Sequence, residues 1–219
     1  MLQIQRASIK LVLMTKKRAP KKTRDLERSR TEILEAAFPL IFRHGFQGVS
    51  IDQIVAATSM TKGAFYHQFP TKLDLGYALV DDVIKPMIIS RWIAPLAACE
   101  NPIAGILKRL KILVGGAPAA ELKLGCPLNN LVQEMSPLDA EFKRRLEAAL
   151  ELWISGMEHE LKRAKRDGFL KSDVNTRQVA HFLVMAHEGF YGMLKGLDDP
   201  RAFDALYSSL KIFLEMIET

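Results

Sequence analysis

Apolar residues recur at every third or fourth position along almost the whole chain from about residue 25, which places them on one face of an α-helix. No stretch shows the sustained alternation of apolar and polar residues that is typical of half-buried β-strands. Residues that start and stop helices divide the pattern into about nine segments. The sequence therefore predicts an all-α fold of about nine helices.

Four of the expected helices lie in the first part of the chain and have local start and stop signals. They span about 25–44, 51–58, 61–69 and 71–86. Residues that can cap a first helical turn precede three of them: Ser50 with Gln53, Thr61, and Thr71 with Asp74. Pro86 is expected to kink or end the fourth helix, because proline lacks a backbone N–H.

Five further helices are expected in the remainder of the chain. They cover about 101–115, 127–135, 136–166, 175–195 and 199–219. A cap residue followed by proline marks three of the starts: Asn101 with Pro102, Ser136 with Pro137, and Asp199 with Pro200. The helix from residue 136 is the longest, with acidic residues at its start and basic residues at its end, as the helix dipole favours.

The composition is that of an ordinary globular protein, with 48% hydrophobic and 26% charged residues in a chain of 219. No apolar run approaches the roughly 20 residues that a bilayer-spanning helix needs. The two cysteines, Cys99 and Cys126, show no metal-ligand spacing and give no disulfide framework. We therefore expect a cytoplasmic protein with no membrane partner, no cofactor and no metal site.

Positive charge is concentrated at the N-terminus. Residues 1–24 contain eight basic residues and no acidic one, so the remainder sums to −2 in a chain of net charge +6. Such an arm is typical of proteins that approach phosphates, because each lysine or arginine at a phosphate releases a counterion. A solvated tail that improves solubility has the same composition. Residues 1–24 are interpreted as a flexible basic arm, with both roles open.

Residues 45–72 carry the most informative pattern, because two short helices joined by a tight turn follow a longer helix. This is the helix-turn-helix arrangement, whose second helix fits the major groove of DNA. In that second helix, Ala64, Phe65 and Phe69 can face the core. The residues left outward contain no carboxylate: Thr61, Lys62, Tyr66, His67 and Gln68. The alternative is that the aromatic residues among them are ordinary half-buried positions of an amphipathic helix.

The same region resembles the TetR/AcrR family of transcriptional regulators. The resemblance is carried by Arg30, Ala36, Ala37, Phe38, Gly45, Phe46, Ser50, Ile51, Ile54, Ala57, Gly63, Phe65, Tyr66, Phe69 and Lys72. It implies a DNA-binding domain at 25–72 and a ligand-binding and dimerisation domain at 73–219. It also implies a repressor that binds a palindromic double-stranded DNA operator as a homodimer and is released by a small-molecule effector.

The resemblance further implies which residues contact DNA. The expected set is Ser50, Thr61, Lys62, Gly63, Tyr66, His67, Gln68 and Lys72. Thr61 and Lys62 match positions over base edges, whereas positions near phosphates are matched by Tyr66, His67 and Lys72. Gln68 departs from the histidine that is frequent in the family. That contact is expected to change, or to become a base contact, since glutamine can pair with adenine.

Two further surfaces are expected in the second domain. Large apolar and aromatic residues, which are equally typical of an ordinary core, are candidates for the effector site. They are Met87, Trp92, Phe142, Trp153, Met157, His187, Phe190 and Tyr191. Small and apolar residues of the last two helices can complete a four-helix bundle with a second copy. This dimer interface is expected to contain Gly189, Gly192, Phe203, Leu206, Leu210 and Phe213.

Cys126 suggests an alternative function, which is that of a repressor that senses thiol oxidation or electrophiles through this residue. It lies in the segment 125–131, which resembles one found in a subset of these regulators that includes electrophile-responsive members. A thiol near a helix start can have a lowered pKa and act as a redox sensor, although a lone cysteine is more often a small buried apolar residue.

A basic-armed interaction scaffold is a further alternative. An enzyme is not expected, because the sequence has no glycine-rich phosphate loop, His-Glu-x-x-His motif or nucleophile elbow.

Overall fold

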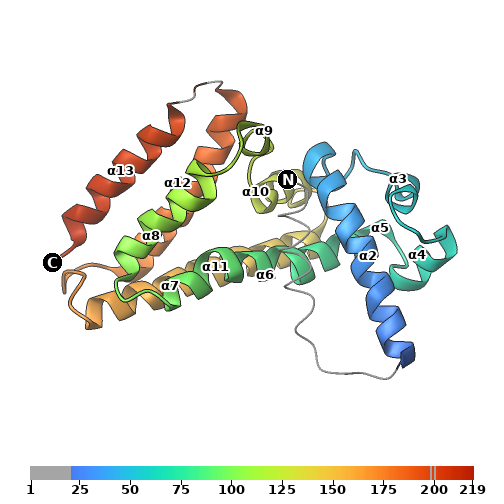
Figure 1. The fold of residues 1–219 in the computed structure, drawn as a ribbon, viewed down its shortest axis with the longest axis horizontal. Helices are drawn as coiled ribbons and strands as arrows, with labels where there is room; N and C mark the ends of the chain where they lie inside the picture. Colours follow the sequence, from blue (N-terminus) through green and yellow to red (C-terminus); the bar gives the residue numbers. More distant parts are fainter. Residues whose placement is uncertain (1–20, 198, 200) are drawn as a thin grey trace. The chain divides into compact units, whose positions relative to one another are not determined.

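The computed structural model describes residues 21–197, 199 and 201–219, and this part of the chain is helical (Figure 1). Its secondary structure consists of α-helices, three π-helical segments (η) and one isolated β-bridge between Leu170 and Glu218. The predicted all-α fold is confirmed. No helix of the described residues is long and apolar enough to cross a membrane. The predicted basic arm, residues 1–24, lies mostly outside these residues.

The helices follow one another along the chain in a simple order. The first are α2 (Lys21–His44), α3 (Ile51–Ala56) and α4 (Lys62–Gln68). One continuous stretch then contains α5 (Lys72–Ala78), η1 (Leu79–Ile84), α6 (Lys85–Ile88), η2 (Ile89–Ile93) and α7 (Ala94–Ala97). A second contains α8 (Pro102–Leu110) and η3 (Lys111–Gly115). The last are α9 (Ala119–Leu122), α10 (Pro127–Met135), α11 (Ala140–Arg166), α12 (Thr176–Gly196) and α13 (Ala202–Ile217). All predicted helices are found, and α9 is one additional turn.

The chain divides into two compact units. Unit 1 consists of the described residues up to Met87 together with Asn130–Ala149, and unit 2 consists of Ile88–Asn129 and Leu150–Thr219. The helices α6, α10 and α11 each begin in one unit and end in the other. The functional division at residue 72 remains a prediction.

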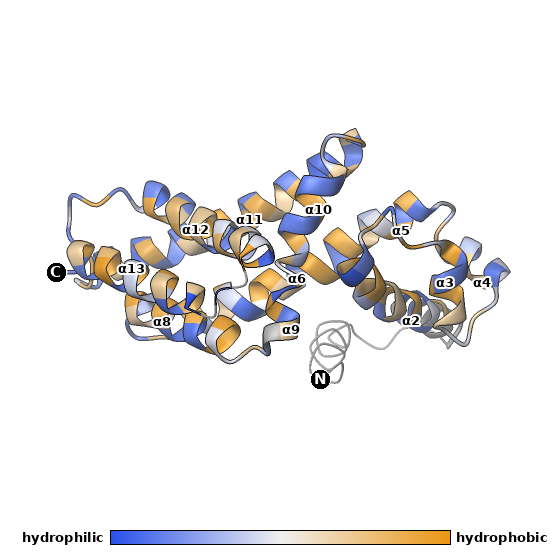
Figure 2. Cartoon of the chain, turned by 90° about the horizontal axis from the view of Figure 1, so that it is seen from above, coloured by the Kyte–Doolittle hydropathy of each residue, from blue (hydrophilic) through white to orange (hydrophobic). Residues whose placement is uncertain are grey.

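In unit 1, α2 packs with α3 and α4 around fully buried apolar side chains, which include Ile33, Leu34, Ala37, Ile54, Phe65 and Phe69. Phe142 of α11 is also buried in this unit, where it packs against α5. Gly76 permits this approach, because a Cβ at that position would lie only 2.4 Å from the Phe142 ring. Hydrophobic and hydrophilic residues occupy different sides of the helices (Figure 2), as amphipathic helices require.

Local sequence sets the starts of the first short helices as predicted. Ser50 and Gln53 form a capping box at α3, Thr71 and Asp74 form another at α5, and Thr61 Oγ1 accepts from an N–H of the first turn of α4. These caps satisfy backbone N–H groups that have no partner within the helix. The predicted N-caps of α3, α4 and α5 are therefore confirmed.

Pro86 was expected to kink or end its helix, and it does not end it, because the stretch from Lys72 to Ala97 is continuous. The π-helical segment η1 lies just before Pro86, and η2 lies just before Pro95. At the end of η1 the N–H of Lys85 donates to the carbonyl of Val80, five residues back. A proline ring crowds the carbonyl four residues back. The wider π turn moves the hydrogen bond to the carbonyl five residues back, and the helix can therefore continue past Pro86.

The longest helix begins later than expected, at Ala140 rather than after Ser136. The backbone at 136–139 completes the end of α10, since the N–H groups of Leu138 and Asp139 both donate to the Met135 carbonyl. The Asp139 carboxylate then accepts from the N–H of Phe142 at 2.7 Å. Asp139, and not Ser136, therefore caps α11.

Unit 2 contains α8, α12, α13 and the later part of α11. Ile93 packs onto Gly156, where a Cβ would lie 2.3 Å from its Cδ1 atom. Arg163 of α11 donates to the Leu96 carbonyl at 2.8 Å and pairs with the buried Glu160 at 2.8 Å. These contacts hold the end of α7 against α11.

Candidate functional site

Helix α4 exposes the residues that were expected to face outward. Phe65 and Phe69 are buried, whereas Thr61, Lys62, Gly63 and His67 are exposed, Tyr66 is 44% exposed and Gln68 is half-buried. A Cβ built on Gly63 would find only the Thr61 side chain within 4 Å, at 3.9 Å. Packing inside the chain therefore gives no reason for a glycine here. The missing side chain leaves the α4 backbone open to close approach from outside.

The turn between α3 and α4 is fixed by a carboxylate of α2. Glu32 Oε1 accepts from both the N–H and the hydroxyl of Ser59, each at 2.7 Å. These two bonds hold the pKa of Glu32 below its ordinary value. Arg30, also on α2, lies over the Phe69 ring at 4.7 Å. The sequence analysis missed Glu32, because nothing local to residues 58–61 indicates a partner 27 positions earlier.

Lys62 is paired in the free protein. Its Nζ lies 2.7 Å from the carboxylate of Asp52 at the start of α3, and this bond raises the pKa of the lysine. The outward side chains of α4 contain no carboxylate, but the neighbouring helix supplies one. Because both side chains are well exposed, such a pair is weak and a phosphate or a base can replace it. Ser50 also has a partner in the free protein, because its hydroxyl caps α3.

Lys72 lies at the other end of the same surface. Its Nζ is 3.4 Å from the carbonyl oxygen of Gln47 and 4.7 Å from the centre of the Phe46 ring. Desolvation lowers the pKa of this lysine. The turn that carries its partners is anchored by Glu134 of α10, whose two oxygens accept from the N–H groups of Phe46 and Gln47, each at 2.8 Å. Sequence reasoning missed this anchor too.

Unit 2 contains a narrow cavity that encloses about 270 Å³ of empty space, part of it open to solvent. Its lining is almost entirely apolar: Trp92, Ile106, Leu110, Trp153, Met157, Leu183, Val184, His187 and Leu210. Four of the predicted effector residues, Trp92, Trp153, Met157 and His187, are brought together here. The indole N–H of Trp153 is buried without a hydrogen-bond partner.

The other four predicted effector residues do not line this cavity. Met87 and Phe142 belong to unit 1, where the Phe142 ring packs 5.0 Å from that of Phe46 and 5.2 Å from that of Tyr77. The cause is that α11 runs through both units, so its first turns serve the other core. Phe190 is buried outside the lining. Tyr191 packs behind the wall, with its ring 4.9 Å from that of His187.

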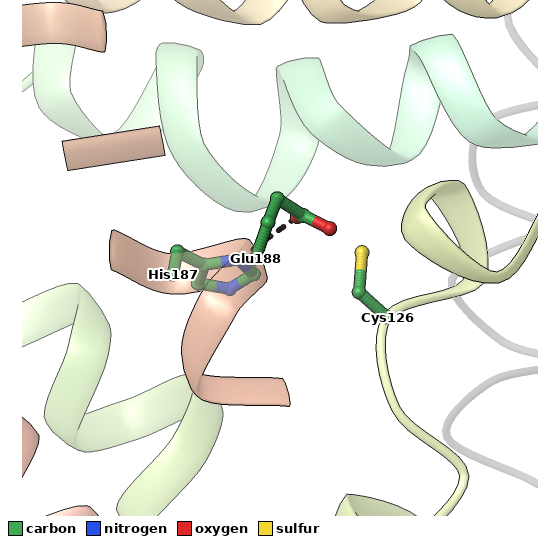
Figure 3. Close-up of side chains that lie close together, drawn as sticks. All are labelled: Cys126, His187 and Glu188. Atoms are coloured by element: carbon green, nitrogen blue, oxygen red, sulfur yellow. Dashed lines mark hydrogen bonds and ion pairs between the residues drawn. The ribbon is translucent and has the colours of Figure 1, made fainter. Parts of the chain in front are cut away.

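Cys126 lies immediately before α10, near His187 and Glu188 of α12 (Figure 3). It is 8% exposed. Desolvation and the nearby Glu188 carboxylate raise the pKa of its thiol well above the ordinary value, although the N–H groups of Asn129 and Leu128 act in the opposite direction. A neutral, buried thiol is a poor nucleophile. This environment opposes the electrophile-sensing alternative.

The predicted dimer residues fall into three groups by exposure. Gly189 and Gly192 are exposed on α12, with no atom within 4 Å of a built Cβ. Large apolar side chains are also exposed on α12 and α13: Phe182, Met185, Met193, Ile212 and Met216. Phe203, Leu206 and Phe213 are half-buried. Leu210 is a wrong assignment to this surface, because it is 3% exposed and lines the cavity from within.

The arrangement of α2, α3 and α4 is that of a helix-turn-helix protein. Residues 33–78 match the family described as bacterial regulatory proteins, tetR family, and residues 107–210 match one described as tetracyclin repressor-like, C-terminal domain. The chain belongs to the TetR family of transcriptional regulators. Regulators of this family are DNA-binding proteins and not enzymes, which agrees with the sequence-based expectation.

Known relatives support this assignment over most of the chain. The LmrA transcriptional regulator of Bacillus subtilis is 30% identical over 135 residues, which are 61% of this chain and 71% of that protein. An HTH-type regulator from the lacX 3′ region of Lactococcus lactis is 26% identical over 88% of this chain and 96% of its own length. The crystal structure of a TetR-family regulator from Cytophaga hutchinsonii superposes with a TM-score of 0.78 at 21% identity, covering 93% of this chain and 99% of that one.

Proposed function

We propose that the protein is a repressor that binds a palindromic DNA operator as a homodimer through α4 and is released by a small-molecule effector bound in unit 2. The observation that carries the DNA-binding part is the outer face of α4. It combines exposed hydrogen-bonding side chains, no carboxylate of its own, and Gly63, which packing within the chain does not require. Such a face can approach base edges in a major groove.

The division of labour on this surface follows from the positions of its side chains. Thr61 and Lys62 begin α4, and residues at the start of a recognition helix contact base edges. Tyr66 and His67 extend the exposed face, and Lys72 supplies a cation at the start of α5. These three residues serve phosphates, which position the protein without reading sequence. Gln68 is half-buried, so its side-chain amide contacts a base only if it turns outward.

The cavity supports a mainly apolar effector that carries one hydrogen-bond acceptor. Its walls are apolar apart from His187 and the unpaired indole N–H of Trp153. A buried donor without a partner costs free energy, which a ligand acceptor recovers. Only about 10 Å³ of the space admits the centre of a water-sized sphere, so an effector has to move the lining side chains apart to enter.

Helix α10 offers a route from the effector region to the DNA-binding surface. It starts directly after Cys126, and near its other end Glu134 holds the turn of Phe46 and Gln47 beside Lys72. The two positions belong to one uninterrupted helix of nine residues. A displacement of its first turn is therefore transmitted to the turn that Glu134 anchors.

The homodimer is supported by the exposed apolar face of α12 and α13. Met185, Met193 and Met216 are each more than 60% exposed, and the glycines between them allow another helix to approach closely. An exposed apolar face of this kind marks an association surface. A second copy buries it in a symmetric four-helix arrangement.

The proposal is tested with operators selected from random duplexes by repeated binding to the full chain. Lys62→Ala should weaken binding to the selected operator about 10-fold or more and relax its base preference, because a base contact is lost. Lys143→Ala changes an exposed lysine of α11 and serves as the matched control. If the two variants bind the operator equally well, or if no operator can be selected, α4 is not the recognition helix.

A further inference from the structure

Three side chains with metal-binding atoms converge in unit 2, although two of them are far from the third in sequence. Cys126 precedes α10, whereas His187 and Glu188 are neighbours on α12 (Figure 3). Their sulfur, nitrogen and oxygen atoms all lie within 4.8 Å of one another, and the cluster is the one such group among the residues that the structure describes. Cys126 and His187 are buried, and the Glu188 side chain is 13% exposed.

We propose that Cys126, His187 and Glu188 form a binding site for a divalent transition-metal ion of the zinc class. A thiolate, an imidazole and a carboxylate are the ligand types that Zn²⁺ takes in proteins. Mg²⁺ and Ca²⁺, which require oxygen ligands, do not match this set. Three protein ligands leave the fourth tetrahedral position for water or a small ligand. The inference goes beyond the proposed function and does not rest on it.

An unsatisfied carboxylate oxygen points independently to a cation. Glu188 Oε1 lies 3.1 Å from His187 Nδ1, whereas Glu188 Oε2 is buried and meets no group with full hydrogen-bond geometry, although the weakly donating Cys126 thiol interacts with this carboxylate. A buried acceptor of this kind costs free energy unless it is paired, and the cost is higher when it is charged. Coordination of a cation by Oε2 removes that cost.

The surrounding residues hold the ligands in place before an ion arrives. The His187 ring is enclosed by three aromatic rings, with centres 5.2 Å away for Trp92, 4.9 Å for Trp153 and 4.9 Å for Tyr191. Such neighbours restrict rotation of a ligating side chain and strengthen a metal site. On binding, the Cys126 S–H bond breaks, the sulfur bonds to the ion, and the proton passes to solvent.

The test uses the full chain, reduced and freed of metal, with no DNA present. Zn²⁺ is titrated against a coloured chelator, and Co²⁺ is added separately so that sulfur-to-cobalt charge transfer can be recorded. We expect one ion per chain and a charge-transfer band. Cys126→Ser should remove the band and weaken Zn²⁺ binding by more than the roughly 10–100-fold that loss of an outer partner costs. Absence of stoichiometric binding overturns the proposal.

Cys99→Ser is the matched control, because Cys99 is the other free cysteine and its thiol donates to the Pro95 carbonyl at 3.2 Å. It should keep both the band and the affinity. Circular dichroism checks that each variant is folded. If Cys126→Ser does not fold, Glu188→Gln keeps the side-chain size and should still weaken Zn²⁺ binding at least about 10-fold. Unchanged affinity in the folded Cys126 or Glu188 variant refutes the site. Because no operator enters the experiment, its failure leaves the proposed function untouched.

Discussion

The carboxylate of Glu134 allows a sharp test of how the DNA-binding surface is held. Its two oxygens accept from the N–H groups of Phe46 and Gln47, each at 2.8 Å. In Glu134→Gln the side chain keeps its size but has one acceptor oxygen, and its NH₂ group faces an N–H group. One charge-assisted bond is lost and a backbone donor is left unpaired, which together cost about 1.5–3 kcal/mol.

This loss is large enough to measure by thermal unfolding. For a chain of 150–250 residues, 1 kcal/mol shifts Tm by about 2–4 °C, so Glu134→Gln should lower Tm by about 3–12 °C. Glu147→Gln is the control, since Glu147 is exposed on α11 and makes no hydrogen bond or ion pair within the described part of the chain. Equal Tm values for the two variants would show that Glu134 does not anchor the turn.

Three further predictions concern charge and association. Lys72→Ala should weaken binding to all duplexes and reduce the salt slope by about one unit, which anisotropy titrations at several salt concentrations measure. Gly192→Glu should give a folded monomer in sedimentation, because no atom lies within 4 Å of its built Cβ, whereas Leu210→Glu should unfold unit 2. The bonds from Arg144 and Arg145 lower the pKa of Glu141 to about 2. A carboxylate with a lowered pKa stabilises the folded state fully at a pH above its ordinary pKa of 4.5, and this stabilisation is lost as the pH falls through the lowered pKa. The stability advantage of the wild type over Glu141→Gln should therefore disappear between about pH 4.5 and pH 2.

The elements that sequence reasoning predicts well are those whose cause is local. The caps at Ser50, Thr61 and Thr71 depend on residues three positions away, so the sequence alone places these starts. The outward face of α4 follows from the positions of Phe65 and Phe69 in the same way. The continuation of the helix past Pro86 could not be predicted, because the π turn that accommodates the proline has no local signal in the sequence.

The elements that sequence reasoning misses depend on contacts between distant segments. Glu32 and Glu134 act on turns that are respectively 27 and 88 positions away from them, and no spacing rule links such residues. Phe142 was assigned to the effector site as a large aromatic residue, but its helix serves two cores. Cys126 gains its acidic and imidazole neighbours only when α12 folds against the start of α10.

The basic arm gives a final prediction that separates affinity from specificity. Residues 1–20 contain five basic residues and no acidic one, and they precede every helix that the structure describes. Each lysine or arginine at a phosphate contributes about 0.9 to the salt slope. Deletion should therefore lower the slope by at most about 4–5 units and weaken operator and random duplexes by the same factor, because a chain of cations follows the backbone without reading bases. Replacing the five residues by glutamine keeps the length and should have the same effect. A loss confined to the operator would mean that the arm reads a groove, and an unchanged slope would mean that it does not touch DNA.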